Sequence, residues 1–596
     1  MNATIKKLLV TAGVLLVSLP VAVFAGNNEH GIDYYRAELY GAAKIFFLQQ
    51  TEQTVEEQAE NYYYLGQIYY KLGQIDSAQY FYNKSIATDA EYPFGYIGNG
   101  SLELKKGNLK QAEELFKKAT GLAKKDPSVP TLVAEAYVEH EKYSEANDAL
   151  KKARKINSQY SGIYTTEGDM LMKQNKVGDA MGKYDNAILF NAKEKATYLK
   201  CAQVYKTLNP DRSLEYLDDL FKIDANYIPA FALYGDIYRA QGDAYKEEND
   251  TVNYEAAYTK ALDAYEKFIS IPGVPVLQHE RYAQLLFFTK NYDRAEKEIA
   301  AVLAIDPDNT VMHRIEAYNN FALGKDDVAL EQITNFLAIT PANKQLFVDH
   351  RAQGDIYLKK GDFIKGEESY LNAMKFDDTK KAELYGKLIN AAEDAKDYPI
   401  SIGLYEKFFE ASPDYSTLSL YKYGQANYNA SIAYTDKTVV AEEKANPSLQ
   451  EVNEAAFNVY IQKGNKAFSD MISRKSDNYL GYLWKARIHS IADAFDQIRE
   501  RSMKWHAKQY YEEALPVLIA NNENGDRKND IVEAYRYIGN YYYSAEKNVD
   551  KMAEYYKKAL EFDPENDQIQ GVLDSISKMK AQQRAAATKA AAEQGN

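Results

Sequence analysis

The sequence has few of the residues on which disulfide-rich secreted domains depend. Its 596 residues include one cysteine, Cys201, which excludes an intramolecular disulfide, and we expect this thiol to pack as a small apolar side chain. Tryptophan occurs only twice whereas tyrosine occurs 52 times, so tyrosine is predicted to fill the large planar core positions. Proline, with 15 residues, is scarce, which is typical of a nearly all-helical chain.

Motifs for catalysis and ligand binding are also missing. The sequence has no GxxxxGK[ST] phosphate loop, no GxSxG elbow and no DxDxDG calcium loop. His279-Glu280 and His140-Glu141 begin like a zinc-protease motif, but neither is followed by the required second histidine. The many carboxylates are explained by surface solvation. We therefore predict a protein that is not an enzyme, with no catalytic residue, no cofactor and no metal.

The balance of charge excludes two classes of partner. The formal net charge is -14 and the isoelectric point is near 5.3. Nucleic acids and anionic lipids are recognised through excess lysine and arginine, so neither is expected as the main partner.

Residues 1–25 have the features of a secretory signal peptide. Lys6 and Lys7 precede an apolar run from Leu8 to Phe24, and Ala25 ends a small-residue cleavage site. The alternative is an uncleaved membrane anchor of marginal length. Because the cleavage region lacks cysteine, a lipoprotein is disfavoured, and we expect a soluble protein of the periplasm or the exterior with no transmembrane helix after cleavage.

The stretch from Tyr62 to Ser85 defines the unit that the rest of the chain repeats. Its apolar and small residues recur at intervals of three and four on both sides of Gly73, which predicts two short amphipathic helices joined by a turn. Such a small hairpin cannot bury its apolar face alone and must stack on copies of itself. Further copies follow, with matching glycine, alanine and aromatic residues at Tyr96, Gly100, Phe116, Tyr164, Gly168, Tyr184, Phe231, Gly235, Gly354, Tyr370, Tyr535, Gly539 and Tyr556.

This recurrence resembles the tetratricopeptide repeat family, whose 34-residue unit has an aromatic residue at position 4, Leu-Gly at 7 and 8, Tyr at 11, Ala at 20, Phe or Tyr at 24 and Ala at 27. The resemblance implies an all-α fold, an α-solenoid of about 13 helical hairpins forming a right-handed superhelix. The predicted organisation is a signal peptide (1–25), N-terminal capping helices (26–60), a main array (61–434), a polar loop (435–453), C-terminal hairpins (454–565) and a solvating helix with a disordered tail (566–596). About fourteen extra residues near Ala244–Tyr254 are expected to lengthen both helices of the sixth hairpin.

Glycine at position 8 is predicted to admit an aromatic side chain of the neighbouring helix. We expect Gly66, Gly100, Gly168, Gly235 and Gly354 to make this contact, and a Gly235→Leu substitution to cost about 1 to 3 kcal/mol by overpacking.

Proteins of this family bind peptides and proteins on the concave face made by the first helices. Positions 5, 9 and 12 are expected to face that groove, whereas Tyr62, Tyr69 and Tyr82 are expected in the core. The candidate binding residues are Tyr63, Gln67, Tyr70, Thr165, Asp169, Met172, Arg314, Tyr318, Arg351 and Asp355. For the exposed tyrosines among them, simple solvent exposure is an equal alternative. The family's carboxylate clamp is disfavoured, since Arg536 and Asn540, its nearest match, lie in the last repeat.

Three histidines, His279, His313 and His350, fall on position 4 of successive repeats. A shared metal site would need ligands about 2.0 to 2.1 Å from the ion, whereas packed helices are about 8 to 10 Å apart. We interpret the three as planar replacements for core aromatics.

The leading functional hypothesis is a periplasmic scaffold or adaptor that binds other proteins or peptides of the bacterial envelope. A glycan-binding or nutrient-capture protein is the alternative from another class, motivated by export and by the many tyrosines. A chaperone for exported or outer-membrane clients is the third.

Overall fold

Every secondary-structure element in the described part of the chain, residues 28–50, 53–248 and 250–594 of a computed structural model, is a helix. The predicted signal peptide therefore lies outside the described residues. The chain divides into two compact units, one up to Phe336 and one from Leu337, and the boundary falls within helix α19 (Asp326–Ile339). No described helix is long and apolar enough to span a bilayer.

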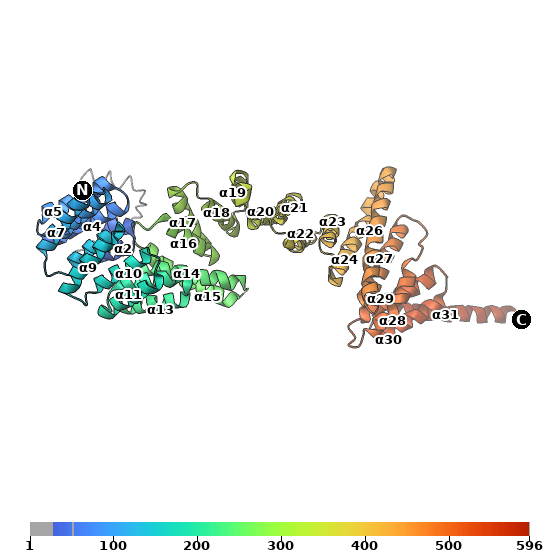
Figure 1. Cartoon of the computed structure of the whole chain (residues 1–596). Helices are drawn as coiled ribbons and strands as arrows, with labels where there is room; N and C mark the ends of the chain where they lie inside the picture. Colours follow the sequence, from blue (N-terminus) through green and yellow to red (C-terminus); the bar gives the residue numbers. More distant parts are fainter. Residues whose placement is uncertain (1–27, 51–52, 249, 595–596) are drawn as a thin grey trace. The chain divides into compact units, whose positions relative to one another are not determined.

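The first unit consists of helix pairs that follow one another along the sequence (Figure 1). Its helices before α19 are α2 (Glu29–Arg36), α3 (Tyr40–Gln49), α4 (Val55–Lys71), α5 (Ile75–Thr88), α6 (Phe94–Lys105), α7 (Leu109–Leu122), α8 (Ser128–Glu139), α9 (Tyr143–Ile156), α10 (Ser161–Lys173), α11 (Val177–Phe190), α12 (Lys195–Leu208), α13 (Pro210–Ile223), α14 (Ile228–Glu247), α15 (Thr251–Ile269), α16 (Val276–Phe288), α17 (Tyr292–Ile305) and α18 (Thr310–Ala322).

The second unit continues the hairpin pattern. Its helices are α20 (Phe347–Lys359), α21 (Phe363–Met374), α22 (Lys381–Asp394), α23 (Tyr398–Ala411), α24 (Thr417–Ile432), α25 (Lys437–Ala445), α26 (Pro447–Arg474), α27 (Tyr479–Ile498), α28 (Ala507–Ala520), α29 (Lys528–Ser544), α30 (Val549–Phe562) and α31 (Asp567–Gln594). Three single 3-10 turns lie at Ala342–Lys344, Asp378–Lys380 and Ala433–Thr435.

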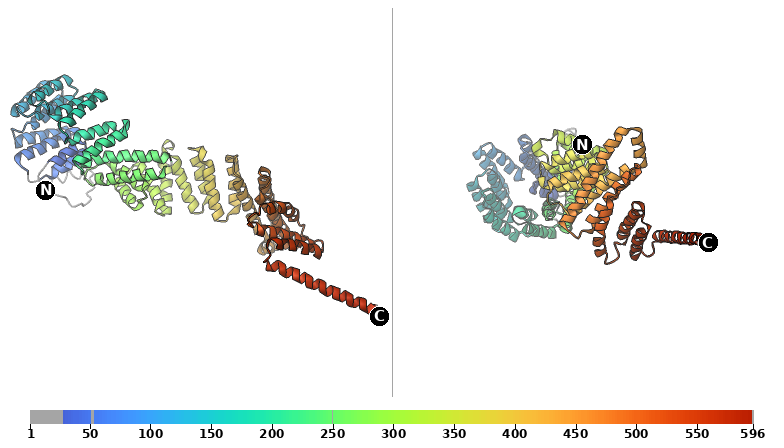
Figure 2. Two further views of the ribbon diagram at one scale, coloured as in Figure 1. Left: turned by 90° about the horizontal axis from the view of Figure 1, so that it is seen from below. Right: turned by 90° about the vertical axis from the view of Figure 1, so that its right-hand side faces the viewer.

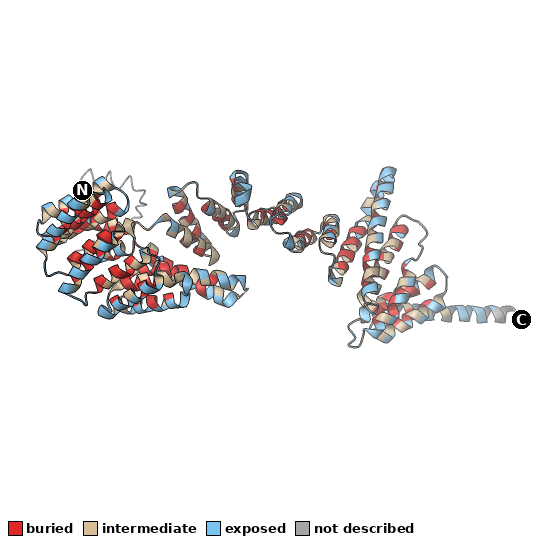
Figure 3. Ribbon diagram, viewed as in Figure 1, coloured by how far each residue is buried: buried red, intermediate tan, exposed pale blue. Residues whose placement is uncertain are grey.

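The apolar core is a series of clusters, each shared by neighbouring hairpins of one unit. In the first unit, successive clusters join α3 to α6, α6 to α10, α11 to α14 and α15 to α18. In the second, clusters join α21 to α27, α27 to α29 and α29 to α31. Burial therefore follows both units along the sequence instead of collecting in one centre (Figure 3). This is the arrangement of a helical solenoid, as the sequence predicts.

The predicted glycine–aromatic contacts are confirmed. A Cβ atom built on Gly66, Gly100, Gly168, Gly235 or Gly354 would lie 2.3 to 2.6 Å from a ring carbon of the facing aromatic residue, closer than real Cβ atoms approach. Only glycine therefore fits beside these rings. The lengthening of the sixth hairpin is confirmed too, since α14 has 20 residues and α15 has 19. A further contact in these longer helices pairs Gly242 with Tyr258.

The predicted loop at residues 435–453 is wrong, because α25 and the beginning of α26 occupy it. The Asp436 side chain accepts a hydrogen bond from the backbone N–H of Thr438 and so begins α25, and Pro447 stands in the first turn of α26. Most side chains of α25 are exposed, and only Val440 and Glu443 are buried. A short helix with so small a buried face has the composition of a loop.

The predicted N-terminal capping region contains two helices, α2 and α3, separated by residues 37–39, where Glu38 has a φ of 61°. At the other end, α31 continues through Gln594 and extends beyond α30 as one helix (Figure 2). Ile569 and Leu573 anchor its first turns, whereas residues 581–588 are exposed.

Candidate functional site

The first helix of each hairpin was predicted to carry the binding residues, so their contacts decide what this surface can do. Tyr63 and Tyr70 are 3% and 5% exposed, which makes the prediction of groove-facing tyrosines wrong at both positions. The Tyr63 ring packs against Tyr82 and Phe94. The Tyr70 hydroxyl lies 3.1 Å from Nε2 of His140, the residue that follows α8. The side chains of later repeats thus cover this face of α4. Tyr62, expected in the core, is only half-buried.

Asp169 and Asp355 follow the contact glycines Gly168 and Gly354, and their carboxylates are engaged within the array. Asp169 accepts a hydrogen bond from the hydroxyl of Tyr184, the ring that Gly168 admits, at 2.7 Å. Its other contact is Lys200 on α12, the first helix of the next hairpin, at 2.7 Å. Each carboxylate therefore connects its own hairpin to the following one.

The same arrangement occurs at two further Gly-Asp pairs. Asp355 accepts from the hydroxyl of Tyr370 and pairs with Lys387 of the next hairpin at 2.8 Å. Asp236 accepts from the hydroxyl of Tyr265 and binds Arg281 of the next hairpin at 2.8 Å. Burial raises the pKa of Asp236, but hydrogen bonds and positive charge from Lys206, Tyr265 and Arg281 outweigh it, so its pKa is lowered. The sequence signal for this arrangement is a Gly-Asp dipeptide at positions 8 and 9 of the repeat.

The other predicted residues also contact neighbouring helices. The Thr165 hydroxyl lies 3.1 Å from that of Thr197, and the Gln67 amide donates to the Tyr63 hydroxyl. Met172 packs against the cluster of α11 to α14. The remaining contacts on α18 and α20 are Arg314 over the ring of Phe336, Tyr318 beside Phe287, and Arg351 with Asp355 at 3.9 Å. The prediction that these residues bind a partner is untested.

The N-terminal helix α2 lies across the first helices of its unit. The Tyr35 ring stacks edge-on against Tyr64 of α4 with ring centroids 5.4 Å apart. At the start of α12, Arg36 pairs with Glu194 at 3.2 Å. Just after α3 begins, Gly41 meets Gly273, where a Cβ on Gly41 would lie 2.3 Å from the Gly273 carbonyl oxygen. The sequence did not predict these contacts between distant segments.

The three aligned histidines do not share a site. His279 Nδ1 lies 2.5 Å from Glu298 Oε1, His313 Nε2 lies 2.8 Å from the Pro307 carbonyl, and His350 Nε2 lies 2.9 Å from Gln345 Oε1. Among the described residues, no group of three or more His, Cys, Asp or Glu side chains is placed to hold a metal ion.

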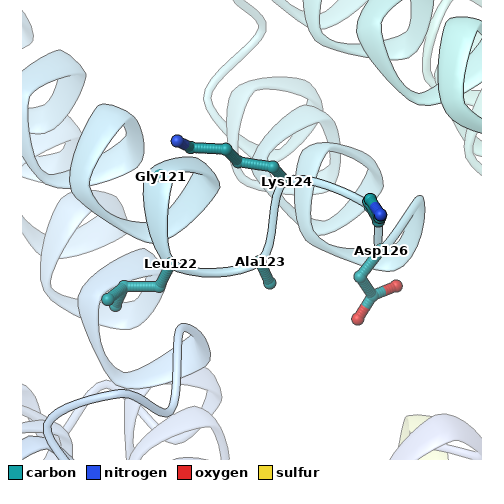
Figure 4. A pocket seen from close by; sticks show the side chains of 6 residues that line it. Gly121, Leu122, Ala123, Lys124 and Asp126 are labelled. Atoms are coloured by element: carbon teal, nitrogen blue, oxygen red, sulfur yellow. The ribbon is translucent and has the colours of Figure 1, made fainter.

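The lone thiol and the surface hollow at the α7–α8 turn offer no reactive arrangement. Cys201 is buried in the cluster of α11 to α14, and burial raises the pKa of its thiol to about 12. The hollow is lined by the α7–α8 turn, residues 121–126. Figure 4 shows the side chains of Lys124 and Asp126 extending in different directions rather than converging on a common point.

The tetratricopeptide repeat model matches residues 59–92 and 538–566, the first hairpin and most of the last. The chain is a tetratricopeptide repeat protein. Between the matched copies, hairpins of the same kind recur with the Gly-aromatic contacts described above. A comparison of this chain with curated proteins found no match.

Several solved structures are similar to this tetratricopeptide repeat protein. The C-terminal part of a TPR repeat-containing protein from Cytophaga hutchinsonii is 24% identical, with 49% of this chain and 99% of that one covered and a TM-score of 0.31. PilF of Pseudomonas aeruginosa is 17% identical, with 38% and 98% covered and a TM-score of 0.30. YrrB, described as a TPR protein with an unusual peptide-binding site, is 18% identical, with 29% and 89% covered and a TM-score of 0.18.

The second unit of this tetratricopeptide repeat protein carries an aromatic surface that the sequence analysis missed. Trp484 of α27 meets Tyr421 and Tyr428 of α24 edge-on, with ring centroids 5.8 and 5.2 Å apart. The Arg487 guanidinium lies 5.2 Å from the Trp484 ring and pairs with Glu533 of α29. We call these five residues the aromatic patch. Its three rings are partly exposed.

The repeat register itself points to this patch. With Gly424 at position 8, Tyr421 and Tyr428 take positions 5 and 12, the positions expected to face the groove. The polar composition of residues 435–453, which follow this copy, hides the match because it predicts a loop.

Proposed function

We propose that this tetratricopeptide repeat protein is a non-enzymatic scaffold that binds other proteins in the bacterial cell envelope, in the periplasm. Repeats of this family provide extended surfaces for protein partners. The features of residues 1–25 support export. The observation that carries the proposal is the aromatic patch, since partly exposed tyrosine and tryptophan beside arginine is the composition of an interface centre.

The patch is suited to a peptide or helix that supplies apolar side chains and hydrogen-bond acceptors. Tyr and Trp offer large apolar area with polar tips, and Gln425 already donates to the Tyr421 hydroxyl at 2.7 Å. Leu418, 61% exposed, extends the apolar area at the beginning of α24. The Arg487 charge is balanced by Asp530 and Glu533 at 2.9 and 2.6 Å, so the patch does not demand a charged partner.

Photocrosslinking in living cells tests this proposal. A photoreactive amino acid at Tyr421 of the full chain should capture a defined set of envelope proteins, and Trp484→Ala should reduce that capture at least several-fold. The matched control places the same amino acid at Ile364, 79% exposed on α21 of the same unit. Identical captured sets at the two positions, or no captured protein at either, would contradict the proposal.

Binding of a glycan is the second candidate, because sugar rings also stack on open tyrosine and tryptophan faces. A glycan array probed with the full chain distinguishes the two. Binding to a defined glycan class that Trp484→Ala abolishes, without any protein captured at Tyr421, would favour the glycan.

A further inference from the structure

The surface of the first unit that lies beneath α2 has one lysine, Lys195, at its centre, beside two carboxylates of the same surface, Glu194 and Asp224. Nζ of Lys195, the first residue of α12, lies 2.7 Å from Asp33, 3.3 Å from Glu29 and 3.3 Å from Asp224. Two of these three carboxylates come from α2, more than 160 positions earlier in the chain. The Lys195 side chain is 15% exposed, and Glu29 and Asp33 of α2 are among the groups that surround it.

Aromatic and polar groups surround this lysine. Tyr35 of α2 rests on Tyr64, and its hydroxyl donates to Gln67 at 3.3 Å. The Lys195 ammonium lies 5.1 Å from the ring of Tyr227. A segment seated here thus meets one lysine, one glutamine and two aromatic faces. The groups that α2 supplies in return are carboxylates one helical turn apart and a tyrosine two residues after the second.

The attachment of α2 differs in kind from that of α3. Helix α3 buries five apolar side chains, Ala42, Ala43, Ile45, Phe46 and Phe47, in the core of the unit. Helix α2 fully buries only Gly31 and Asp33. Ile32, Tyr34 and Tyr35 are partly buried against the cluster of α3 to α6, and the remaining contacts of α2 are ion pairs and hydrogen bonds. Ionic contacts with partial exposure exchange readily with water and with other charged groups, whereas an apolar core does not.

We propose that the surface formed by Tyr64, Gln67, Glu194, Lys195 and Tyr227 is a binding site for an acidic helical segment of a partner protein, and that α2 is its internal occupant. The partner segment carries two carboxylates one turn apart that pair with Lys195, followed by an aromatic residue that rests on Tyr64. This inference rests on the proposed scaffold function and names the partner class for the first unit. While α2 is in place the site is closed, and a partner gains access by replacing it.

Binding of the chain's own segment in trans tests the proposal. The probe is a fluorescent peptide of residues 28–38, measured by anisotropy against the full chain without residues 1–25. The release variant combines Gly31→Leu with Asp33→Lys. A Cβ on Gly31 would lie 2.4 Å from the Phe46 ring, and the new lysine faces Lys195, so α2 leaves without any change to the receiving surface. We expect at least tenfold tighter peptide binding by the release variant than by the unsubstituted chain.

Two controls make the result specific. Adding Lys195→Asp to the release variant should abolish binding of the natural peptide and restore binding of a peptide with Asp33→Lys. A second release variant, Asp33→Lys with Arg36→Glu, guards against misfolding caused by Gly31→Leu, and helical circular dichroism checks both. Equal binding by released and unsubstituted chains, or binding that ignores Lys195→Asp, would overturn the proposal. Crosslinking at Tyr421 concerns the second unit, so the two proposals fail independently.

Discussion

Each unit of this tetratricopeptide repeat protein holds a helix that lies outside the hairpin pattern, and the two are held by opposite physical means. In the first unit, α2 is attached through Arg36–Glu194, whose side chains are 48% and 23% exposed, and through one lysine shared by three carboxylates. In the second, α25 is attached through Glu443 and Arg499, whose side chains are 3% and 4% exposed. The attachment of α2 thus includes an exposed ion pair, whereas the ion pair that holds α25 is almost fully buried.

The two buried carboxylates at these attachments titrate in opposite directions. Burial raises the pKa of both. For Asp33 burial prevails over the attraction of Lys195, so its pKa is raised. For Glu443 the hydrogen bonds from Arg499, at 2.6 and 2.9 Å, and from Asn453 prevail, so its pKa is lowered. A carboxylate with its own arginine stabilises its unit when ionised, and one that shares a lysine does not.

The largest expected loss of stability follows from disrupting the buried ion pair of Glu443 and Arg499. Glu443→Gln leaves the Arg499 guanidinium buried without its counter-charge and should destabilise the second unit by about 3 to 5 kcal/mol. Asp33→Asn should change the stability of the first unit by less than about 1 kcal/mol, because its ionised form is not favoured there. Urea unfolding followed by tryptophan fluorescence reports the second unit, which contains Trp484 and Trp505, and circular dichroism reports both. Equal losses of stability in the Glu443→Gln and Asp33→Asn variants would show that the two attachments do not differ in this way.

Acidification should destabilise the second unit through His489. Burial, with Lys485 and His506 nearby, lowers the pKa of His489 to about 4. Folding therefore favours neutral His489, and the second unit should lose roughly 2 to 3 kcal/mol as the pH falls from about 6.5 to 4. In the first unit, burial raises the pKa values of Asp33 and Glu60, so neither carboxyl contributes a loss of stability on acidification.

His489→Gln is the control for this pH dependence. It keeps a planar amide beside Asn465 and the Tyr510 ring but removes the titration. The fluorescence midpoint of this variant should lose most of its slope between pH 6.5 and 4. A slope that is unchanged in the variant would assign the effect to another group.

Disrupting a glycine–aromatic contact should lower the free energy of unfolding by a similar amount in both units. Gly354→Ala places a Cβ 2.3 Å from the Tyr370 ring, and Gly168→Ala places one 2.4 Å from Tyr184. Each should destabilise its unit by about 1 to 3 kcal/mol. Gly386→Ala on α22 is the control, since nothing lies within 4 Å of the new atom and helix propensity should stabilise by about 0.5 to 1 kcal/mol. A loss at Gly386 would refute the steric explanation.

The smallest expected effects separate two tyrosines at equivalent positions. Tyr184→Phe removes the hydrogen bond to Asp169 and should cost about 0.5 to 1.5 kcal/mol. The Tyr82 hydroxyl is buried and has no hydrogen-bond partner among the described residues, so Tyr82→Phe should be neutral or stabilising. Thermal unfolding of the two variants side by side measures the difference, and a larger loss for Tyr82→Phe would contradict this assignment.

The repeat register predicted what is local to a hairpin. The glycine contacts and the long sixth hairpin follow from spacing alone, because each involves residues a few turns apart. The register did not predict contacts across several hairpins. Tyr70 contacts His140 two hairpins later in the chain, and Asp33 contacts Lys195 five hairpins later. The repeat register therefore predicted neither the burial of Tyr70 nor the surface that α2 covers. Sequence spacing carries no information on how far the array curves back on itself.

The Gly-Asp pairs have a mechanical consequence. Asp169, Asp236 and Asp355 each hold a tyrosine of their own hairpin and a cation of the next one. Separating two hairpins at one of these places leaves the carboxylate without one of its two partners. Stretched between its ends, the chain is therefore expected to extend in steps longer than a single hairpin wherever such a pair joins neighbours, and in single-hairpin steps elsewhere.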